Sequence, residues 1–253
     1  MTVAIAEEVE RPHRRSLAGY AVTPAVLLLV VAGLALYVSN RELDSIEERR
    51  LTLEFIIPAT LQHITLTFVS TAIVLVLAVP VGILLTRPFA RGVVAPAVAV
   101  FNVGQAVPSI GVLVLLAIVW GIGFWPAVVA LVAYSALPVL RNTVVGLQQV
   151  DPSVIEAGRG MGMSRSGVLA RIELPLAVPV VLTGLRTALV INVGTAALAA
   201  LTNAGGLGTI IITGLVQNRP IVTVVGSVLT AVLALFIDYV GRVAEDVLRP
   251  KGL

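Results

Sequence analysis

The stretch DPSVIEAGRGMGMSRSGVLARIELP, residues 151–175, is a polar and glycine-broken interruption in a chain that is otherwise almost entirely apolar. The pattern predicts two short helices joined by a hinge. Asp151 followed by Pro152 is a good start for the first helix, because aspartate caps helices and proline is tolerated at the first helical position. Ser153 with Glu156 three residues later forms a capping box, which is an equally good start.

Three glycines are expected to end the first helix, because each lowers helix stability by about 1 kcal/mol relative to alanine; they are Gly158, Gly160 and Gly162. Ser164 can cap the second helix. Pro175 is expected to stop that helix by pushing Leu174 out of the helical region. Apolar side chains and three arginines then give the pair of helices an apolar face with a basic rim, which suits a groove on a partner protein. The arginines are Arg159, Arg165 and Arg171.

The residue order in this stretch resembles the EAA loop of the membrane subunits of ABC importers. The resemblance is carried by Glu156-Ala157, then Gly162 six residues after the glutamate, then Ile172-x-Leu174-Pro175. In that family the loop is a cytoplasmic coupling helix that docks into a cleft of the ATP-hydrolysing subunit. The resemblance implies the same ATPase-coupling role here for Glu156, Ala157, Gly158, Gly162, Met163, Ser164, Arg165, Ile172, Leu174 and Pro175.

One departure from the motif is visible, since its third position is Gly158 in this chain. A glycine there is expected to loosen the first helix. The alternative interpretation is an amphipathic loop that merely joins two membrane helices.

The composition predicts a membrane protein. Of the 253 residues, 58% are hydrophobic and 12% are charged, where a soluble domain carries roughly 25% charged residues. The mean hydropathy is +1.02. The net charge of +3 is explained by arginines that flank membrane spans, and without basic patches interleaved with aromatics we expect no binding to nucleic acid. The chain has no cysteine and only two histidines, which argues against a metal site.

Charge-free runs predict six membrane spans, because about 20 helical residues cross a hydrocarbon core of about 30 Å. The run 92–140 is too long for one span. It is divided at WGIGFWP, residues 120–126, where glycines, a proline and two interfacial tryptophans coincide. The predicted spans are 21–38, 62–85, 94–119, 126–146, 176–201 and 220–240. A short surface helix is expected within 41–54, and a half-buried helix at 209–216.

The fold class is therefore an all-α membrane protein of about six transmembrane helices. We expect three parts: residues 1–58, with a tail, the first span and an external charged segment; a permease domain, 59–241; and a C-terminal tail, 242–253. Most lysines and arginines lie on the side of the 151–175 loop, so the positive-inside rule makes that loop and both termini cytoplasmic. The expected location is the bacterial inner membrane, in contact with lipid.

Polar residues within or beside the spans are candidates for a translocation pathway. The third span combines helix breakers with amides, which is tolerated where the backbone faces protein or water. Hydrogen bonds between helices, worth about 1 kcal/mol or less each, explain these residues equally well. The candidates are Asn102, Gln105, Ser109, Asn192, Thr195 and Asn203. His63 is expected to lie at the membrane interface. Arg186 is expected to reach the interface or to pair with Asp238.

The chain has no ATP-binding motif of its own. A phosphate-binding loop needs G-x-x-x-x-G-K-[ST], and the only lysine is Lys251. If ATP drives transport, ATP and Mg²⁺ belong to a separate ATPase subunit, and this chain is non-catalytic and binds no cofactor. An ion-coupled secondary transporter is the alternative from another class, but such carriers place ionisable groups inside the membrane. An intramembrane serine hydrolase would need a histidine in a late span.

Segments beyond the loop resemble permeases of the glycine betaine/choline (osmoprotectant) importer family. They cover most of residues 60–241 and include NVGQAVPSIGVLVLL and GTAALAALTNAGGLG. The resemblance implies a type I (MetI-like) permease core working with two ATPase subunits, an external substrate-binding protein and a second permease, either identical or a related paralogue. No cluster of aromatic residues offers a cage for a quaternary amine, so selectivity is expected in the binding protein. The other substrate considered is a small zwitterion such as a methionine-like amino acid.

Overall fold

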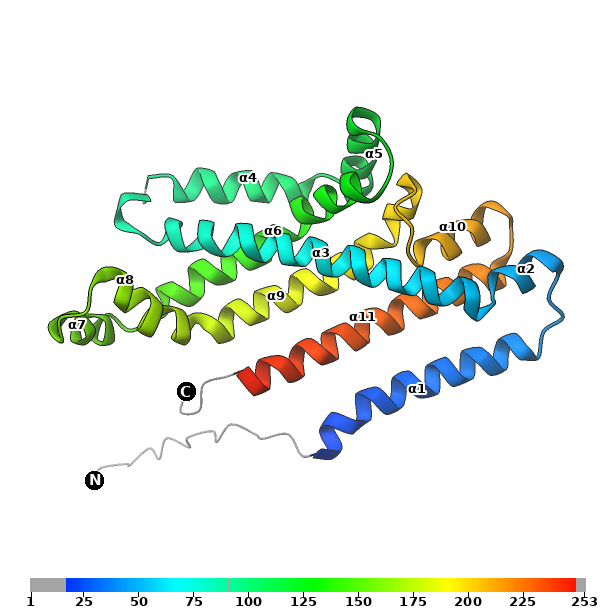
Figure 1. Ribbon diagram of the computed structural model, residues 1–253, viewed down its shortest axis with the longest axis horizontal. Helices are drawn as coiled ribbons and strands as arrows, with labels where there is room; N and C mark the ends of the chain where they lie inside the picture. The colour runs from blue at the N-terminus through cyan, green and yellow to red at the C-terminus, as the bar shows by residue number, and fades with distance from the viewer. Residues whose placement is uncertain (1–16, 91, 249–253) are drawn as a thin grey trace, which may run out of the picture.

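The computed structural model describes residues 17–90 and 92–248, and every regular element in this part of the chain is helical. Long helices run side by side, with α7 and α8 at one end and α2 and α10 at the other (Figure 1). We call these the loop end and the far end. The elements are α1 (Leu17–Ser39), α2 (Ser45–Arg50), α3 (Leu53–Leu85), η1 (Pro88–Ala90), α4 (Val94–Ala106), α5 (Ser109–Trp120), α6 (Phe124–Gln148), α7 (Pro152–Gly160), α8 (Arg165–Val168), the π-helical turn η2 (Leu169–Glu173), α9 (Leu174–Ala196), η3 (Leu198–Thr202), α10 (Gly208–Val216) and α11 (Pro220–Leu248).

Five helices of the described chain are long and apolar enough to cross a membrane. They are Tyr20–Ser39, Leu53–Leu85, Phe124–Gln148, Arg165–Ala196 and Pro220–Val247. The predicted third span is divided into α4 and α5. The break falls at Val107 and Pro108, because proline lacks an N–H and disfavours a helical conformation in the residue before it. The expectation of about six spans therefore becomes five long helices and one broken pair.

The expectation that Pro175 ends a helix is wrong. Leu174 is helical, with φ −64° and ψ −48°, and α9 follows η2 without a break. In η2 the N–H of Leu174 bonds to the carbonyl of Leu169, which is the wide register of a π-helix. Pro175 follows directly in the first turn of α9. Proline is tolerated at this position although it has no N–H to donate. The chain from Arg165 to Ala196 is consequently one continuous rod.

Helices α3, α6 and α9 form the centre of the bundle. Their cores include Leu66 and Val74 from α3, Leu131 and Leu140 from α6, and Ala188 from α9, all buried. Small residues let these helices approach closely. A Cβ atom on Gly184 of α9 would lie 2.9 Å from the carbonyl oxygen of Pro138 on α6.

Helix α1 lies at the edge of the bundle and packs against α11 (Figure 1). Among its residues from Tyr20 onward, only Leu27 is buried. The hydroxyl of Tyr20 donates a 2.7 Å hydrogen bond to Asp246 near the end of α11. Most of the other apolar side chains of α1 are exposed, as expected of a helix that faces lipid.

The short surface helix expected within 41–54 is confirmed as α2. Asp44 caps it, and Asp44 and Glu47 form a capping box. Arg219, at the turn before α11, pairs with Asp44 at 2.7 Å. The backbone N–H of Glu47, together with that of Ile46 and the charge of Arg219, holds the pKa of Asp44 below its usual value. The half-buried helix expected at 209–216 is confirmed as α10.

Candidate coupling and translocation sites

Asp151 caps α7, so the structure selects one of the two predicted starts. The Asp151 carboxylate accepts a 2.8 Å hydrogen bond from the N–H of Ser153, and Pro152 occupies the first turn. Ser153 is therefore inside the helix, and the capping box with Glu156 does not form. The N–H and hydroxyl of Ser153 lower the pKa of Asp151.

Gly162 ends α7, whereas Gly158 and Gly160 lie within it, against expectation. Gly162 has φ +82°, a conformation that favours glycine. Its N–H bonds to the carbonyl of Arg159 at 2.9 Å, and the N–H of Met163 bonds to the carbonyl of Gly158 at 3.2 Å. This pair of bonds is a Schellman motif, and it fixes the angle between α7 and α8.

Gly158 is the position at which α7 packs against the segment that follows it. It is buried, and a Cβ atom there would lie 2.5 Å from Cδ1 of Ile172 and 3.5 Å from Cγ2 of Val168. The departure from the motif at this position therefore does not break the helix. Instead it brings the α7 backbone close to the side chains of α8 and η2.

Ser164 caps α8, as predicted, by accepting a 3.1 Å hydrogen bond from the N–H of Gly167. We call α7, α8 and η2, residues 152–173, the coupling element, after the role that the sequence resemblance predicts for them. Its exposed surface mixes apolar and basic side chains, since Met161 is 74% and Val154 is 42% exposed. The basic members are Arg159, Arg165 and Arg171, all exposed. Of the predicted coupling residues, Gly158 is buried, Met163, Ile172 and Leu174 are half-buried, and Glu156, Ala157, Gly162, Ser164, Arg165 and Pro175 are exposed.

An ion pair missed by the sequence analysis joins the coupling element to α3. Glu173, 5% exposed, receives two hydrogen bonds from Arg87: Nη2 to Oε2 at 2.5 Å and Nη1 to Oε1 at 3.4 Å. The only signal in the sequence was a glutamate inside the Ile-x-Leu-Pro pattern. Its partner lies 86 positions away, which no local pattern discloses.

The pathway candidates fall into three separate places. Asn102 is exposed on α4 and accepts a 2.6 Å hydrogen bond from Arg141, and Ser109 opens α5. The side chain of Gln105 lies outside the part of the chain that the structure describes.

Asn192 and Thr195 are buried inside the helix packing. Asn192 donates a 2.9 Å hydrogen bond to Thr71 of α3, while its carbonyl oxygen has no partner among the described residues. Asn203 ends η3 in a left-handed conformation. It lines a polar pocket of about 410 Å³ at the far end, together with Arg50 and Glu54.

His63 is fully buried among the helices. Its Nδ1 accepts a 3.2 Å hydrogen bond from the N–H of Leu207, so Nε2 carries the proton and donates to the carbonyl of Val193 at 2.9 Å. The imidazole thereby joins α3 to α9 and to the segment that leads into α10.

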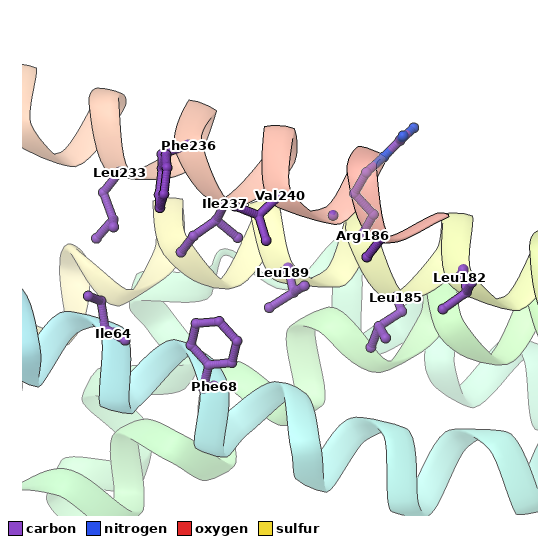
Figure 2. A pocket seen from close by; sticks show the side chains of 12 residues that line it. Ile64, Phe68, Leu182, Leu185, Arg186, Leu189, Leu233, Phe236, Ile237 and Val240 are labelled. Carbon is purple, nitrogen blue, oxygen red and sulfur yellow. The ribbon is translucent and has the colours of Figure 1, made fainter. Parts of the chain in front are cut away.

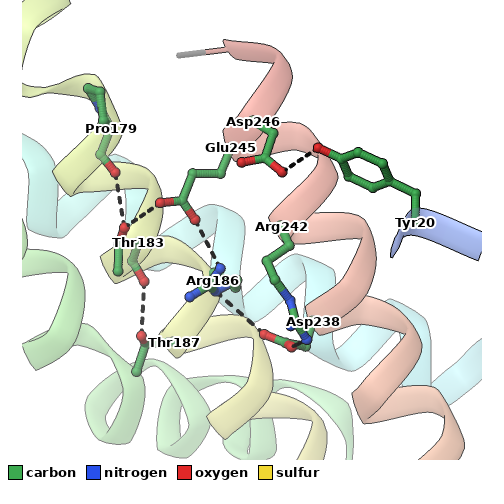
Figure 3. Close-up of polar contacts among 9 residues, drawn as sticks. All are labelled: Tyr20, Pro179, Thr183, Arg186, Thr187, Asp238, Arg242, Glu245 and Asp246. Atoms are coloured by element: carbon green, nitrogen blue, oxygen red, sulfur yellow. Dashed lines mark hydrogen bonds and ion pairs between the residues drawn. The ribbon is translucent and has the colours of Figure 1, made fainter. Parts of the chain in front are cut away.

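The predicted pairing of Arg186 with Asp238 is confirmed, as part of a larger cluster on α9 and α11 (Figure 3). Arg186 lies 3.4 Å from Asp238 and 3.0 Å from Glu245. Thr183 donates a 2.8 Å hydrogen bond to Glu245, and Arg242 pairs with Asp238. Glu245 was missed because the last span was expected to end at residue 240, whereas α11 continues to Leu248.

An apolar cavity of about 250 Å³ lies between α3, α9 and α11 (Figure 2). Phe68, Leu189 and Phe236 are among its walls, and Arg186 is its only charged lining residue. The guanidinium of Arg186 is already paired with carboxylates, so this cavity offers a polar solute no free partner. Within the described residues no group of three or more acidic, histidine or cysteine side chains is placed to hold a metal ion.

Comparison with known proteins identifies the family. The family model for the binding-protein-dependent transport system inner membrane component matches residues 78–251. The osmoprotectant import permease protein OsmY of Salmonella typhimurium is 40% identical over 216 residues, covering 85% of this chain and 89% of the relative. The choline transport system permease protein OpuBB of Bacillus subtilis is 39% identical, covering 77% and 88%.

Among solved structures, an inward-facing conformation of the MetNI methionine ABC transporter is similar. Its TM-score is 0.68 at 26% identity, and the match covers 77% of this chain and 96% of that chain. The fold and these matches agree. The chain belongs to the binding-protein-dependent transport system inner membrane components, the permease subunits of ABC importers.

Proposed function

We propose that this chain is the transmembrane permease of an ATP-driven importer for osmoprotectants, that is, glycine betaine, choline or related quaternary amines. The proposed coupling to the ATPase is supported by the geometry of the coupling element. Helix α7 is seated through Gly158 on a segment that runs without a break into the membrane helix α9. The substrate class is supported by relatives named for osmoprotectant and choline transport.

The proposed mechanism follows from that continuity. ATP and Mg²⁺ bind a separate ATPase subunit, and this chain binds no cofactor and performs no catalysis. ATP binding closes two ATPase subunits, and the coupling element moves with them because its exposed apolar and basic surface docks in their clefts. Helix α9 moves with the coupling element, and the spans swing from inward-open to outward-open.

The remaining assignments complete the proposal. A second permease, identical or paralogous, and an external substrate-binding protein complete the importer. The loop end and both termini face the cytoplasm, the permease domain is 59–241, and the location is the bacterial inner membrane. The solute crosses the membrane along a pathway lined by weakly polar side chains. The candidates for these side chains are Asn102, Gln105, Ser109, Asn192, Thr195 and Asn203.

A methionine-like amino acid is the second candidate solute, favoured by the structural similarity to the methionine transporter. The family assignment leaves no reason to retain an ion-coupled carrier. One experiment on the complete importer distinguishes between these two candidate solutes.

The test is ATPase activity of the reconstituted complex of this subunit, its ATPase and its binding protein. We expect stimulation by binding protein loaded with glycine betaine, and loss of that stimulation in Gly162→Asp. Aspartate tolerates the left-handed conformation better than most residues, so the variant should fold. Its carboxylate would disturb a basic docking surface. Gly92→Asp is the matched control, since Gly92 is exposed and a Cβ there meets nothing within 4 Å.

Each outcome has a clear meaning. Stimulation by methionine but not by betaine or choline would replace the solute. Normal uptake in Gly162→Asp would refute the coupling role of this loop. Failure of the chain to assemble with any ATPase subunit would refute the proposal as a whole.

A further inference from the structure

The ion pair between Arg87 and Glu173 has a position that suggests more than support of the fold. We propose that Arg87 and Glu173 are positioning residues that transmit the movement of the coupling element to α3. The inference rests on the proposed function, because it assigns the route by which the docked element moves a second membrane helix.

The guanidinium of Arg87 is fixed to the end of α3 before it reaches Glu173. Its Nε donates to the carbonyl of Ile83 and to the hydroxyl of Thr86, both at 3.2 Å. The two terminal nitrogens then hold the two oxygens of Glu173. This planar, two-point contact fixes both distance and orientation, which a lysine at position 87 could not do. The side chain of Arg87 is therefore held rigidly at the end of α3.

On the other side, Glu173 stands at the boundary between the coupling element and α9. It is the last residue of the π-helical turn, and α9 begins at Leu174 with Pro175 in its first turn. π-helical turns are rare and are found at functional sites, and Pro175 removes one backbone hydrogen bond from this junction. Glu173 therefore adds a second link, to α3, at the point where the coupling element continues into α9.

Burial makes the pair sensitive to the loss of either partner. The side chain of Glu173 is 7% and that of Arg87 is 24% exposed. Removing one member of a pair this buried leaves the other charge without compensation. Helix α3 packs in turn against α6 and α9, so a displacement of its end reaches the centre of the bundle.

The first test measures solute imported per ATP hydrolysed by the reconstituted importer. We expect Arg87→Gln and Glu173→Gln to keep assembly and ATP hydrolysis but to lower this ratio about fivefold or more, the usual range of coupling between sites. The exchange Arg87→Glu with Glu173→Arg should recover part of the ratio, and Arg87→Lys should fall between. Arg219→Gln is the matched control, because it breaks an ion pair at the far end.

The second test measures the movement itself and does not depend on transport. The chain has no cysteine, so spin labels attach only at Val76→Cys on α3 and Ser166→Cys on α8, both exposed. In the assembled complex we expect one narrow distance distribution that stays constant between nucleotide states. Glu173→Gln should broaden that distribution or make it nucleotide-dependent.

The proposal is overturned if the single variants assemble and import the wild-type amount per ATP. It is equally overturned if the label distance is unaffected by Glu173→Gln, or if the exchanged pair is no better than the single variants. A wild-type complex without solute-dependent ATP hydrolysis would instead refute the proposed function, so the two failures are distinguishable.

Discussion

The close packing of Gly158 against Ile172 allows a prediction of a change in stability, and the magnitude of that change follows from the geometry. Alanine in place of a helical glycine normally stabilises a helix by about 1 kcal/mol. Here the new Cβ would lie 2.5 Å from Cδ1 of Ile172, so that methyl must leave its rotamer at a cost of about 1 kcal/mol. The two effects cancel, and Gly158→Ala alone should leave the stability of α7 nearly unchanged.

Ile172→Val removes the obstructing methyl. The loss of that half-buried group costs about 1 kcal/mol, but it also frees the space next to residue 158. Gly158→Ala introduced into Ile172→Val should therefore show the full gain of about 1 kcal/mol. The expected coupling energy between the two positions is about 1 kcal/mol, within the range found for residues in contact.

Amide hydrogen exchange over residues 152–160 measures this in the purified protein. A gain of 1 kcal/mol corresponds to about fivefold slower exchange. Gly158→Ala should have little effect in the wild-type background and a fivefold effect beside Ile172→Val. A fivefold gain in the wild-type background would show that Ile172 does not obstruct residue 158, and equal effects in both backgrounds would refute the packing argument.

Three further predictions concern single sites. His63→Phe should destabilise the far end by about 1–3 kcal/mol, because a buried carbonyl and a buried N–H lose their partner; differential scanning calorimetry in detergent should show a lower Tm, while Leu61→Ala, at an exposed position of the same helix, serves as control. Arg186→Met should lower Tm less than removal of a fully buried partner would, because Arg186 is 27% exposed, and it should increase proteolysis near the end of α11. The depressed pKa of Asp151 means that its cap stabilises α7 above the unfolded pKa and is lost as pH falls through the folded pKa. Exchange protection of α7, corrected for intrinsic rates, should therefore drop at acid pH in the wild type and be pH-independent in Asp151→Asn.

Features with local causes could be predicted from the sequence. Ser164 needs only the N–H of Gly167, three residues on, and Gly162 needs only its own freedom at positive φ. The break at residues 120–126 is likewise confirmed, with Gly121 and Gly123 both at positive φ. Each depends on a few neighbouring residues, and a sequence window contains all of them.

Features that depend on distant partners could not be predicted. His63 binds Val193 and Leu207, which lie more than a hundred positions away, and polarity alone suggested an interfacial histidine. Pro175 failed as a helix stop because a π-helical turn adapts the backbone before it, and no residue preference announces such a turn. The six pathway candidates were grouped by chemistry, whereas their position depends on how α4, α9 and η3 face their neighbours.

The edge position of α1 has a consequence for synthesis. Its hydrogen bond joins Tyr20 to Asp246, 226 positions later, and its main packing partner is α11. At about 5–20 residues per second, roughly 10 to 45 s separate the emergence of α1 from the ribosome and that of its partner. During that interval α1 is an isolated helix in the bilayer, and its charge-free sequence from 16 to 40 lets it wait there without a protein neighbour.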